Sequence, residues 1–565
     1  MYKLLMPSMN RLRVFPFNLA SMEADEQKFR TLKELQPHLG VACLKGLKTK
    51  QFETVIVDAH HGGKALKGGM MLSVAIELSR WLKKNVSEKR VGIVLPPSIG
   101  GFLANIACAL CDKTPVNLNF SSSKESIQSA MRQAELKTIL SADILVQRYP
   151  DFPWTENRFD LPSVIQSFSK MRFLFWRLAI LLLPSSLLAK WLKIPRGGGD
   201  QEAALLFTSG SSGDPKGVPL SHRNILANIA QIHSVLPRED IDSILGCLPI
   251  FHSFGFTVTL WWPMICGPKV ITYISPLETL RLAEIIQQFK ISLLITTPTF
   301  LRGFLKRAKP EQLRSLKMIV TGAEKLPVNL LEEFENKFHI SVCEGYGMTE
   351  TTPVISVNLL DFPHAPHRQP PFRKIGTVGR PLPGIAVRVT NPETGAPQPH
   401  DQTGLLWFKG ANVFNGYLHT EKKNANVLKD GWYCSGDVGY LDAEGFLTIE
   451  GRQSRFSKIG GEMVPHGVVE QKLNDLCAQI DHDYDHLHAA IMGVSDPVKG
   501  EALVALIAIQ VEPQILRKRL AESGLPHLWI PKIFHRVNAI PILPSGKLDL
   551  KNCQTLAEKA FRTLK

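Results

Sequence analysis

The sequence predicts an α/β fold, with a large N-terminal domain of mixed parallel sheets plus a β-rich subdomain and a small α+β C-terminal domain. Apolar strand-like runs alternate with segments of helical period, and several of these runs end in turns rich in Gly, Thr and Pro. The composition is 44% hydrophobic and 21% charged over 565 residues. Such usage is typical of a globular protein that buries more than one core.

The first half of the chain alternates helix and strand patterns. Helices are expected at Met70–Lys84, Phe102–Leu110 and Ile127–Ala134, and strands at Ala203–Phe207, Val91–Leu95, Pro115–Leu118 and Thr138–Leu140. Two more strands, Ile291–Thr296 and Lys317–Thr321, end in polar turns. This alternation predicts parallel strands with crossover helices, and ligands bind beyond the carboxyl ends of such strands. The site is therefore expected beside Thr296–Pro298 and Thr321–Glu324.

The second half has short strands separated by Gly/Pro turns. They begin at Gly376 and include the strings GTVGRPLPG, TGLLWFKG and GFLTIEG, which predict the β-rich subdomain. A smaller α+β pattern begins near Gln453. We therefore expect a large domain over residues 1–452 and a small one over 453–565.

The cysteines and the charge indicate the cellular compartment and the kinds of partner to expect. The nine cysteines are odd in number and scattered, which favours a reducing cytosol over a disulfide framework. Cys108 and Cys111 form a CxxC string, but it lies in an apolar helical run and is expected to pack in the core. No sustained apolar run follows the basic N-terminus, so no secretory signal is predicted. The net charge is +15, yet no basic–aromatic motif or recognition helix indicates a nucleic-acid partner.

The segment 170–196 combines apolar and basic residues. It contains FLFWRLAILLLPSSLLAKWL and six Lys or Arg without an acidic residue. Its uninterrupted apolar stretch, between Arg177 and Lys190, is too short to span a bilayer and contains Pro184. Aromatic and Leu side chains beside cations favour an interfacial helix on an anionic membrane surface. A buried pair of core helices is the alternative. With the cytosolic cysteines, this predicts a cytoplasmic protein, peripheral on the inner face of the membrane.

The loop Leu206–Leu220, LFTSGSSGDPKGVPL, follows a strand and is suited to binding phosphate. Its glycines let the backbone approach a phosphate, and its amides, hydroxyls and Lys216 can donate to phosphate oxygens. It is not the Walker pattern, because Lys216 precedes Gly217 rather than Ser or Thr. A flexible linker is the alternative. The candidate phosphate-binding residues are Thr208, Ser209, Gly210, Ser211, Ser212, Gly213 and Lys216.

Six further strings follow this loop along the chain. They are LPIFHSFG (Leu248–Gly255), TGAE (Thr321–Glu324), YGMTE (Tyr346–Glu350), YCSGD (Tyr433–Asp437), GRQSRFSKIGGE from Gly451, and PSGK ending at Lys547. In this order they resemble the signatures of adenylate-forming acyl ligases, which include acyl-CoA synthetases, peptide-synthetase adenylation domains and luciferases. The resemblance extends from about Gly68 to the C-terminus.

The resemblance implies ATP and Mg²⁺ as cofactors. A carboxylate is a poor acyl donor, and joining it to AMP supplies a phosphate leaving group while charge on the pyrophosphate must be neutralised. Glu350 is a hard oxygen ligand suited to Mg²⁺, with Thr208 as a second oxygen donor. The family places Thr349 at the α-phosphate. Helix capping is the alternative role for Thr349 and Glu350.

Other nucleotide contacts are implied in the same way. Asp437 stands in a turn where a carboxylate can accept both ribose hydroxyls, and Arg452 can reach ribose or phosphate. Tyr346 is expected to stack on adenine. Gly322, Ala323 and Glu324 resemble the adenine-side wall. His252 is expected to position or gate the acyl group, because an ionised carboxylate needs no general base; a core histidine is the alternative.

The last motifs carry the reaction step and the domain rotation. Lys547 is the strongest catalytic candidate, since it can project from a loop to bridge the carboxylate and the phosphate; a solvated surface lysine is the alternative. The family's hinge matches Arg455, and rotation of the small, mobile domain there would bring Lys458–Glu462 toward a thiol channel. Most acyl-CoA ligases have Asp or Lys at the hinge.

This departure at Arg455, together with TPVNLNF at Thr114–Phe120, resembles acyl-[acyl-carrier-protein] synthetases. These include the ligase half of a bifunctional enzyme that re-acylates lysophosphatidylethanolamine. No His–Asp pair has the HxxxxD spacing of its acyltransferase half, so that half is not expected here.

The expected function is ATP-dependent activation of a fatty acid to acyl-AMP, followed by transfer to a pantetheine thiol. The predicted acceptor is acyl-carrier protein, and a long-chain fatty acid–CoA ligase is the alternative. A non-catalytic membrane-bound acyl carrier or scaffold is an alternative of another class. A nucleic-acid ligase would need a KxDG string, which the sequence lacks.

Overall fold

The computed structural model describes residues 18–208, 214–364, 370–459, 462–481, 487–496, 500–542 and 548–563. It contains two compact units. The first comprises residues 1–388, 408–433 and 442–447, and the second comprises residues 389–407, 434–441 and 448–565. The predicted domain boundary at 452/453 stays a prediction.

The largest sheet of the first unit has nine strands. Its order is β15 (Arg380–Pro381), β14 (Val354–Val357), β13 (Val342–Gly347), β12 (Met318–Thr321), β11 (Leu293–Thr296), β9 (Ser243–Gly246), β10 (Lys269–Thr272), β1 (Thr54–Asp58) and β2 (Lys64–Lys67). The inner strands from β13 to β1 pair in parallel. Leu294, Ile319 and Phe334 belong to the core cluster packed on this sheet.

A six-stranded sheet completes the large α/β part. Its order is β6 (Asn157–Asp160), β5 (Thr138–Ser141), β3 (Arg90–Ile93), β4 (Thr114–Asn117), β7 (Glu202–Thr208) and β8 (Lys216–Ser221). All neighbouring strands are parallel except β7 and β8, which form an antiparallel hairpin. The hairpin therefore brings Thr208 and Lys216 opposite each other at the two ends of the phosphate-loop candidate.

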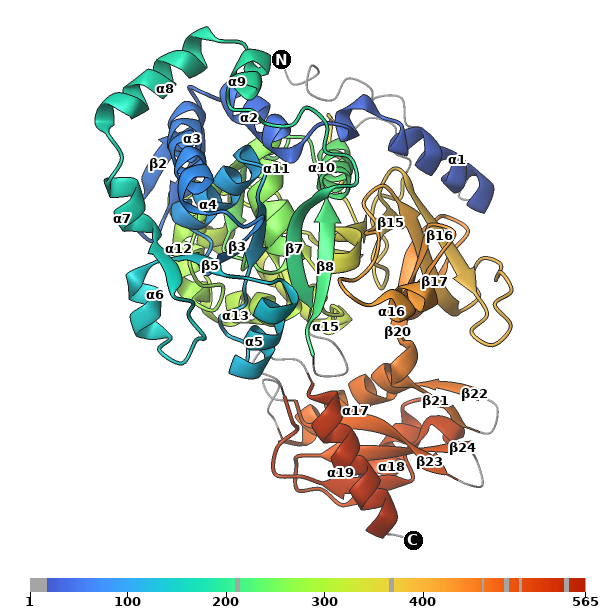
Figure 1. Ribbon diagram of the computed structural model, residues 1–565. Coiled ribbons are helices and arrows are strands. Elements are labelled where there is room, and N and C mark those ends of the chain that lie inside the picture. The colour runs from blue at the N-terminus through green and yellow to red at the C-terminus, as the bar shows by residue number, and fades with distance from the viewer. Residues whose placement is uncertain are drawn as a thin grey trace. The chain divides into compact units, whose positions relative to one another are not determined.

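Helices of the first unit connect and cover these sheets (Figure 1). They are α1 (Leu19–Arg30), α2 (Leu39–Thr49), α3 (Gly68–Asn85), α4 (Ile99–Leu110), α5 (Lys124–Gln133), α6 (Asp143–Arg148), α7 (Leu161–Gln166), α8 (Lys170–Leu182), α9 (Ser185–Trp191), α10 (His222–Val235), α11 (Trp262–Ile265), α12 (Thr279–Phe289), α13 (Pro298–Arg307), α14 (Pro310–Leu313), α15 (Val328–Phe338) and α16 (Glu421–Val427). Polar caps start several of them. At α10, Ser221 and Asn224 form a reciprocal capping box directly after β8.

Two five-stranded sheets occupy the C-terminal part of the chain. One has the order β16 (Ile385–Thr390), β17 (Gly404–Gly410), β19 (Trp432–Leu441) and β18 (Leu428–Lys429), with β20 (Leu447–Arg452) paired to β19. The other has the order β22 (Glu462–Pro465), β21 (Phe456–Ile459), β24 (Gly500–Ile507) and β23 (Ala489–Asp496), with β25 (Ile533–Arg536) paired to β24. Helices α17 (His466–Asp481), α18 (Pro513–Glu522) and α19 (Leu550–Thr563) accompany the second sheet.

The predicted fold class is confirmed. Each helix and strand expected between Met70 and Thr321 is present, with boundaries shifted by a few residues. Cys108 and Cys111 are buried as expected, and all nine cysteines are free thiols. Within the described residues, no helix is both long enough and apolar enough to cross a membrane.

Candidate active site

Three motifs meet where the parallel strands β11, β12 and β13 end. Thr296 pairs with Thr321, and Thr321 pairs with Glu344, so the turns after these strands are neighbours. The amide of Gly322 donates to the Thr296 carbonyl (3.2 Å). A Cβ on Gly322 would lie 3.1 Å from the Gly345 carbonyl oxygen, a close approach that favours glycine. The two turns that were expected to border the site are therefore neighbours at this sheet edge, and the position of the site there stays a prediction.

The backbone after Gly322 is strained. Ala323 has a φ of 69°, which is rare for a residue with a Cβ. Its neighbour Glu324 accepts hydrogen bonds from the amide and the hydroxyl of Thr299 (3.3 and 2.6 Å), at the start of α13. Strain of this kind accumulates at ligand-binding sites. The roles of Gly322, Ala323 and Glu324 at adenine stay predictions.

Strand β13 leads directly into the YGMTE motif. The Tyr346 ring lies near Phe408 (5.8 Å between centroids). Gly347 is required sterically, since a Cβ there would lie 1.9 Å from the Pro353 carbonyl oxygen. The Thr349 hydroxyl lies 3.3 Å from that of Ser253, so YGMTE and LPIFHSFG are in contact.

Glu350 is held by two tyrosines that the sequence reasoning did not single out. The Tyr417 hydroxyl donates to Oε1 of Glu350 (2.6 Å) and lies 3.4 Å from the Tyr433 hydroxyl. Burial, and then the charge of Glu350, raise the pKa of Tyr433 well above its ordinary value. Tyr433 therefore stays protonated. Tyr433 is the first residue of the YCSGD string, so the motif could have identified it. Tyr417 ends the string FNGY, which matches none of the motifs.

Lys216 and Glu350 both contact Tyr417. Its ammonium lies over the Tyr417 ring, 5.1 Å from the centroid, which is a cation–π contact. Lys216 is also the register partner of Thr208. One tyrosine thus holds a carboxylate at its hydroxyl and a cation on its face. The remaining phosphate-loop candidates, Ser209, Gly210, Ser211, Ser212 and Gly213, lie outside the described residues.

These donors fit a magnesium ion that is shared with nucleotide phosphates. Glu350 is buried, and the hydrogen bond from Tyr417 engages its Oε1 atom. A carboxylate with one oxygen anchored and one available is a suitable hard ligand for Mg²⁺, which keeps water and phosphate as its other ligands. Glu350 would hold the ion, and Thr208 would add a hydroxyl oxygen.

His252 is exposed and follows a buried phenylalanine, Phe251, whose ring packs against its own (4.8 Å). The core-histidine alternative is therefore wrong. Gly255, which closes LPIFHSFG, would place a Cβ 2.3 Å from the Pro249 carbonyl oxygen. It begins a buried π-helix, Gly255–Trp261, rich in apolar side chains. The role of His252 at the acyl group stays a prediction.

Two ribose-side candidates meet in the second unit. Arg452 Nε lies 3.0 Å from Asp437 Oδ1, joining the β20 end to β19. Asp437 is buried, and its amide donates to the Ser435 hydroxyl (3.0 Å). Gly436, in the same turn, has a φ of 73°, a conformation that favours glycine. Their contacts with ribose stay predictions.

The hinge candidate Arg455 is fixed within the second unit. It donates to the Ile491 carbonyl (2.9 Å) and pairs with Glu470, whose carboxylate also accepts from the Ile491 amide. Lys458 pairs with Glu393. Lys547 lies outside the described residues. The roles of Arg455, Lys458 and Lys547 stay predictions.

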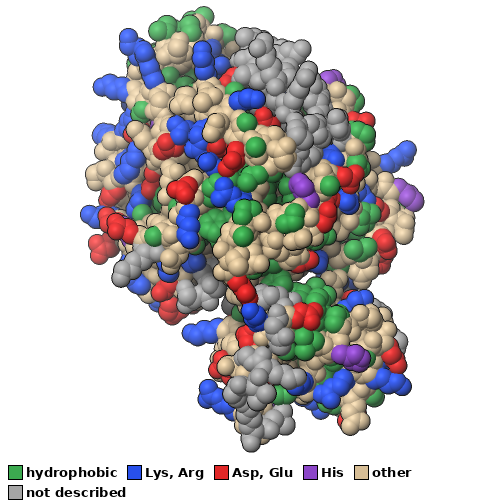
Figure 2. Space-filling model, turned by 90° about the vertical axis from the view of Figure 1, so that its right-hand side faces the viewer, with side chains coloured by type: hydrophobic (Ala, Val, Ile, Leu, Met, Phe, Trp, Pro, Cys, Tyr) green, Lys and Arg blue, Asp and Glu red, His purple; other side chains and the backbone are tan. Residues whose placement is uncertain are grey.

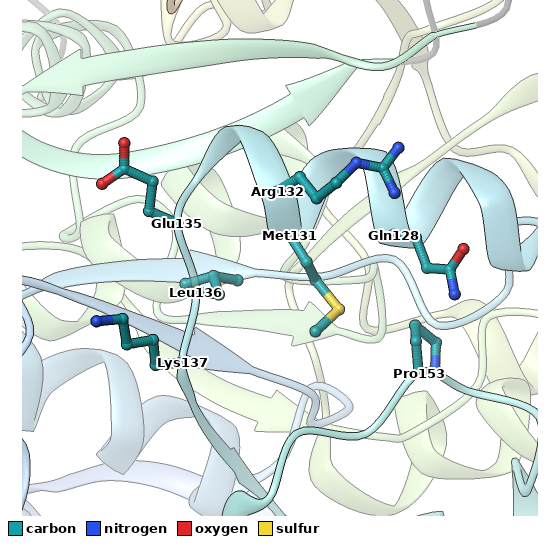
Figure 3. A pocket seen from close by; sticks show the side chains of 7 residues that line it. All are labelled: Gln128, Met131, Arg132, Glu135, Leu136, Lys137 and Pro153. Atoms are coloured by element: carbon teal, nitrogen blue, oxygen red, sulfur yellow. The ribbon is translucent and has the colours of Figure 1, made fainter.

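Figure 3 shows a separate surface hollow. Side chains of α5 and of the segment after it line the hollow, namely Gln128, Met131, Arg132, Glu135, Leu136, Lys137 and, from further along the chain, Pro153. It includes none of the predicted site residues.

His38, Asp112 and His222 gather in the first unit like a set of metal ligands. However, Nδ1 of His38 accepts the Gly40 amide (3.1 Å), and Nδ1 of His222 accepts the Leu39 amide (3.0 Å). Each neutral ring therefore carries its proton on Nε2, which lies 3.2 Å from Asp112 in His38. No Nε2 lone pair is left for a metal. The cluster is structural.

This cluster predicts a loss of stability in acid. Burial, and then the neighbouring His38, lower the pKa of His222 to about 3 from 6.5. At pH values between 3 and 6.5 this histidine is protonated in the unfolded chain but neutral in the folded chain. The free energy of unfolding therefore falls as the pH drops below about 6.5. At pH 5 the titration of His222 lowers the free energy of unfolding by about 2 kcal/mol. Urea unfolding at pH 7.5 and 5 measures it.

The variant His222→Gln removes the titrating ring, and His527→Gln, at an exposed position, is the matched control. The pH-dependent loss should shrink in His222→Gln and persist in the control. An equal loss in both variants would refute the assignment.

The β7–β8 hairpin, the strained turn at Ala323 and the Glu350–Tyr417–Lys216 group all lie within one segment of the chain that a family model matches. Residues 54–418 match the model of the AMP-binding enzyme family, and the chain belongs to that family.

Relatives and solved structures agree with this. The chain is 27% identical over 528 residues to a long-chain-fatty-acid–CoA ligase of Bacillus subtilis, covering 86% of this chain and 89% of that protein. It is 30% identical over 359 residues to 4-coumarate–CoA ligase-like 9 of Arabidopsis thaliana, covering 61% and 60%. Its fold is similar to that of o-succinylbenzoate CoA synthetase from Bacillus subtilis in complex with an acyl-adenylate (TM-score 0.75, 22% identity, 91% and 98% covered).

Proposed function

We propose that the protein activates a fatty acid with ATP and transfers the acyl group to a pantetheine thiol. The observation that carries this proposal is the Tyr417 group, where Glu350 and Lys216 lie on one side chain. A carboxylate that can hold Mg²⁺ beside a mobile cation suits the departing pyrophosphate. The relationship to a long-chain-fatty-acid–CoA ligase, over most of both chains, supports a fatty acid as the substrate.

The residues divide the reaction between binding and charge stabilisation. Lys216 and the Thr208 hydroxyl bind phosphate oxygens, and Thr349 contacts the α-phosphate that the carboxylate attacks. Bound Mg²⁺ supplies positive charge to the phosphates. Tyr417 keeps Glu350 oriented, so little reorganisation is needed as charge moves to pyrophosphate. Lys547 stabilises the attacking oxygen and the α-phosphate together.

For the acceptor we propose acyl-carrier protein. The sequence around Arg455, GRQSRFSKIGG, supports this choice because it lacks the Asp or Lys usual at the hinge of acyl-CoA ligases. Free coenzyme A is the second candidate, favoured by the CoA ligases among the relatives. Both acceptors present the same thiol, so they compete for one acyl-adenylate.

Competition between the two thiols tests the acceptor. With acyl-AMP formed in place and both acceptors present at equal concentration, acylated carrier protein should exceed acyl-CoA at least tenfold. Carrier proteins are acidic, so this preference should decrease with ionic strength if charge contributes to docking. Mass spectrometry of the thioesters measures both products. Equal or greater yield of acyl-CoA at low salt would replace the carrier-protein proposal with the CoA ligase.

A further inference from the structure

Helix α8 presents an apolar stripe to solvent. Its exposed side chains are Met171, Leu174, Phe175, Leu178, Leu181 and Leu182, each between 49 and 74% accessible. They recur at spacings of three and four residues, so they share one face of the helix. An apolar stripe normally faces the protein core, and here it faces away from it.

The opposite face of α8 fixes this orientation. Trp176, Ala179 and Ile180 are buried against the protein, with α8 packed on α3 (Figure 1). The Trp176 indole N–H donates to Glu77, and Arg80 lies over the Trp176 ring (5.6 Å). Because these contacts hold the inner face, the helix cannot rotate to bury its stripe. The predicted alternative of a buried pair of core helices is therefore wrong for α8.

Helix α9 extends the apolar surface. Leu187 and Trp191 are about half exposed, at 51 and 48%. The Trp191 ring contacts Phe175 (5.6 Å) and Trp176 (5.1 Å), which joins the outer face of α9 to the stripe. Eight of the eighteen large apolar side chains that are exposed in the described part of the chain lie between Met171 and Trp191. Single exposed apolar residues are ordinary, but such a concentration marks an interaction surface.

The chain segment that forms this surface carries basic side chains and no acidic ones. Between Leu161 and Gly199 there are six Lys or Arg and no Asp or Glu. Lys48 and Lys83, from α2 and α3, add cations by donating to the carbonyls of Ile180 and Leu192. The nearby carboxylate of Glu77 is buried and lies 3.6 Å from Arg172. By contrast, Figure 2 shows acidic and basic side chains interspersed on another face of the molecule.

We propose that α8 and α9 dock the protein on an anionic phospholipid bilayer. Apolar and aromatic side chains enter the interfacial region, while the flanking Lys and Arg contact lipid phosphates. The 13 residues of α8 extend about 20 Å, less than the hydrocarbon thickness, so the helix lies on the membrane rather than across it. A second copy of this chain would bring the same positive charge, which disfavours self-association through this face. The proposal does not depend on the acceptor of the acyl group.

Co-sedimentation with vesicles tests the proposal on the full chain. Binding should occur with phosphatidylcholine vesicles that contain phosphatidylglycerol, and should be at least tenfold weaker with phosphatidylcholine alone or in high salt. One variant removes positive charge by replacing Lys170, Arg177, Lys190 and Lys193 with Gln. A second variant removes apolar side chains by replacing Leu174, Leu178 and Leu181 with Gln. Each should lower binding at least tenfold. Gln preserves the helix, and unchanged thermal unfolding checks that both variants fold.

Matched controls replace equal numbers of basic or apolar side chains by Gln at exposed positions elsewhere. They are Lys64, Lys124, Lys137 and Lys423 to Gln, and Ile144, Leu277 and Leu280 to Gln. Both controls should bind like the unchanged protein. Equal binding to neutral vesicles, or loss of binding in the controls as well, would overturn the proposal. So would a dimer, detected without lipid, that only the leucine variant dissociates while vesicle binding persists.

Discussion

Replacing Lys547 by Ala is expected to lower acyl-adenylate formation by about two to three orders of magnitude, the scale for losing one preorganised charge at a reacting centre. Thioester formation from supplied acyl-AMP should be much less affected, since we propose that this lysine acts only in the first step. Pyrophosphate release and single-turnover thiol transfer measure the two half-reactions separately.

Lys551→Ala is the matched control, since Lys551 is exposed in α19 and four residues away. It should leave both half-reactions near the unchanged rate. Equal loss of both half-reactions in Lys547→Ala would contradict a role confined to adenylation.

Glu350→Gln is expected to lower adenylation by a similar factor, about 10²–10³-fold, through the loss of a metal-binding charge. Glutamine keeps the size of the side chain and can still accept the Tyr417 hydroxyl, so the fold should not change. The apparent Mg²⁺ affinity should fall with the rate, as a magnesium titration of pyrophosphate release would reveal.

The variant Tyr417→Phe distinguishes the binding of Mg²⁺ by Glu350 from the orientation of Glu350 by Tyr417. It leaves the charge of Glu350 but removes the 2.6 Å hydrogen bond that orients it. We expect a smaller loss, about tenfold, from one neutral hydrogen bond, with partial recovery at high Mg²⁺. An unaltered magnesium dependence in both variants would exclude Glu350 as a ligand.

The fold was predictable because its signals are local. Strands such as β11 and β12 are short apolar runs that end in Thr, and their parallel pairing follows from the helices between them. The motif order then identified Thr349, Glu350 and Asp437 as candidates. In the structure the turns after β11 and β12 are neighbours, and Gly322 lies close to Gly345 in β13.

The features that the sequence did not predict depend on contacts between segments that are distant along the chain. Tyr417 lies 67 residues from the carboxylate it holds, and no local pattern marks a phenol as a partner. The orientation of α8 was equally undetermined, because its sequence fitted either an interfacial or a buried helix. Only tertiary packing shows that Trp176 lies on the inner face. The cytoplasmic, inner-membrane location stays a prediction.

The most direct test of the central claim is to identify the nucleotide and acyl products from ATP and a panel of fatty acids, with carrier protein or coenzyme A as the thiol. AMP and pyrophosphate should form in equal amounts, only when a fatty acid is present, with one acyl thioester for each AMP. Formation of ADP and phosphate, or binding of fatty acid with no release of pyrophosphate, would contradict the central claim.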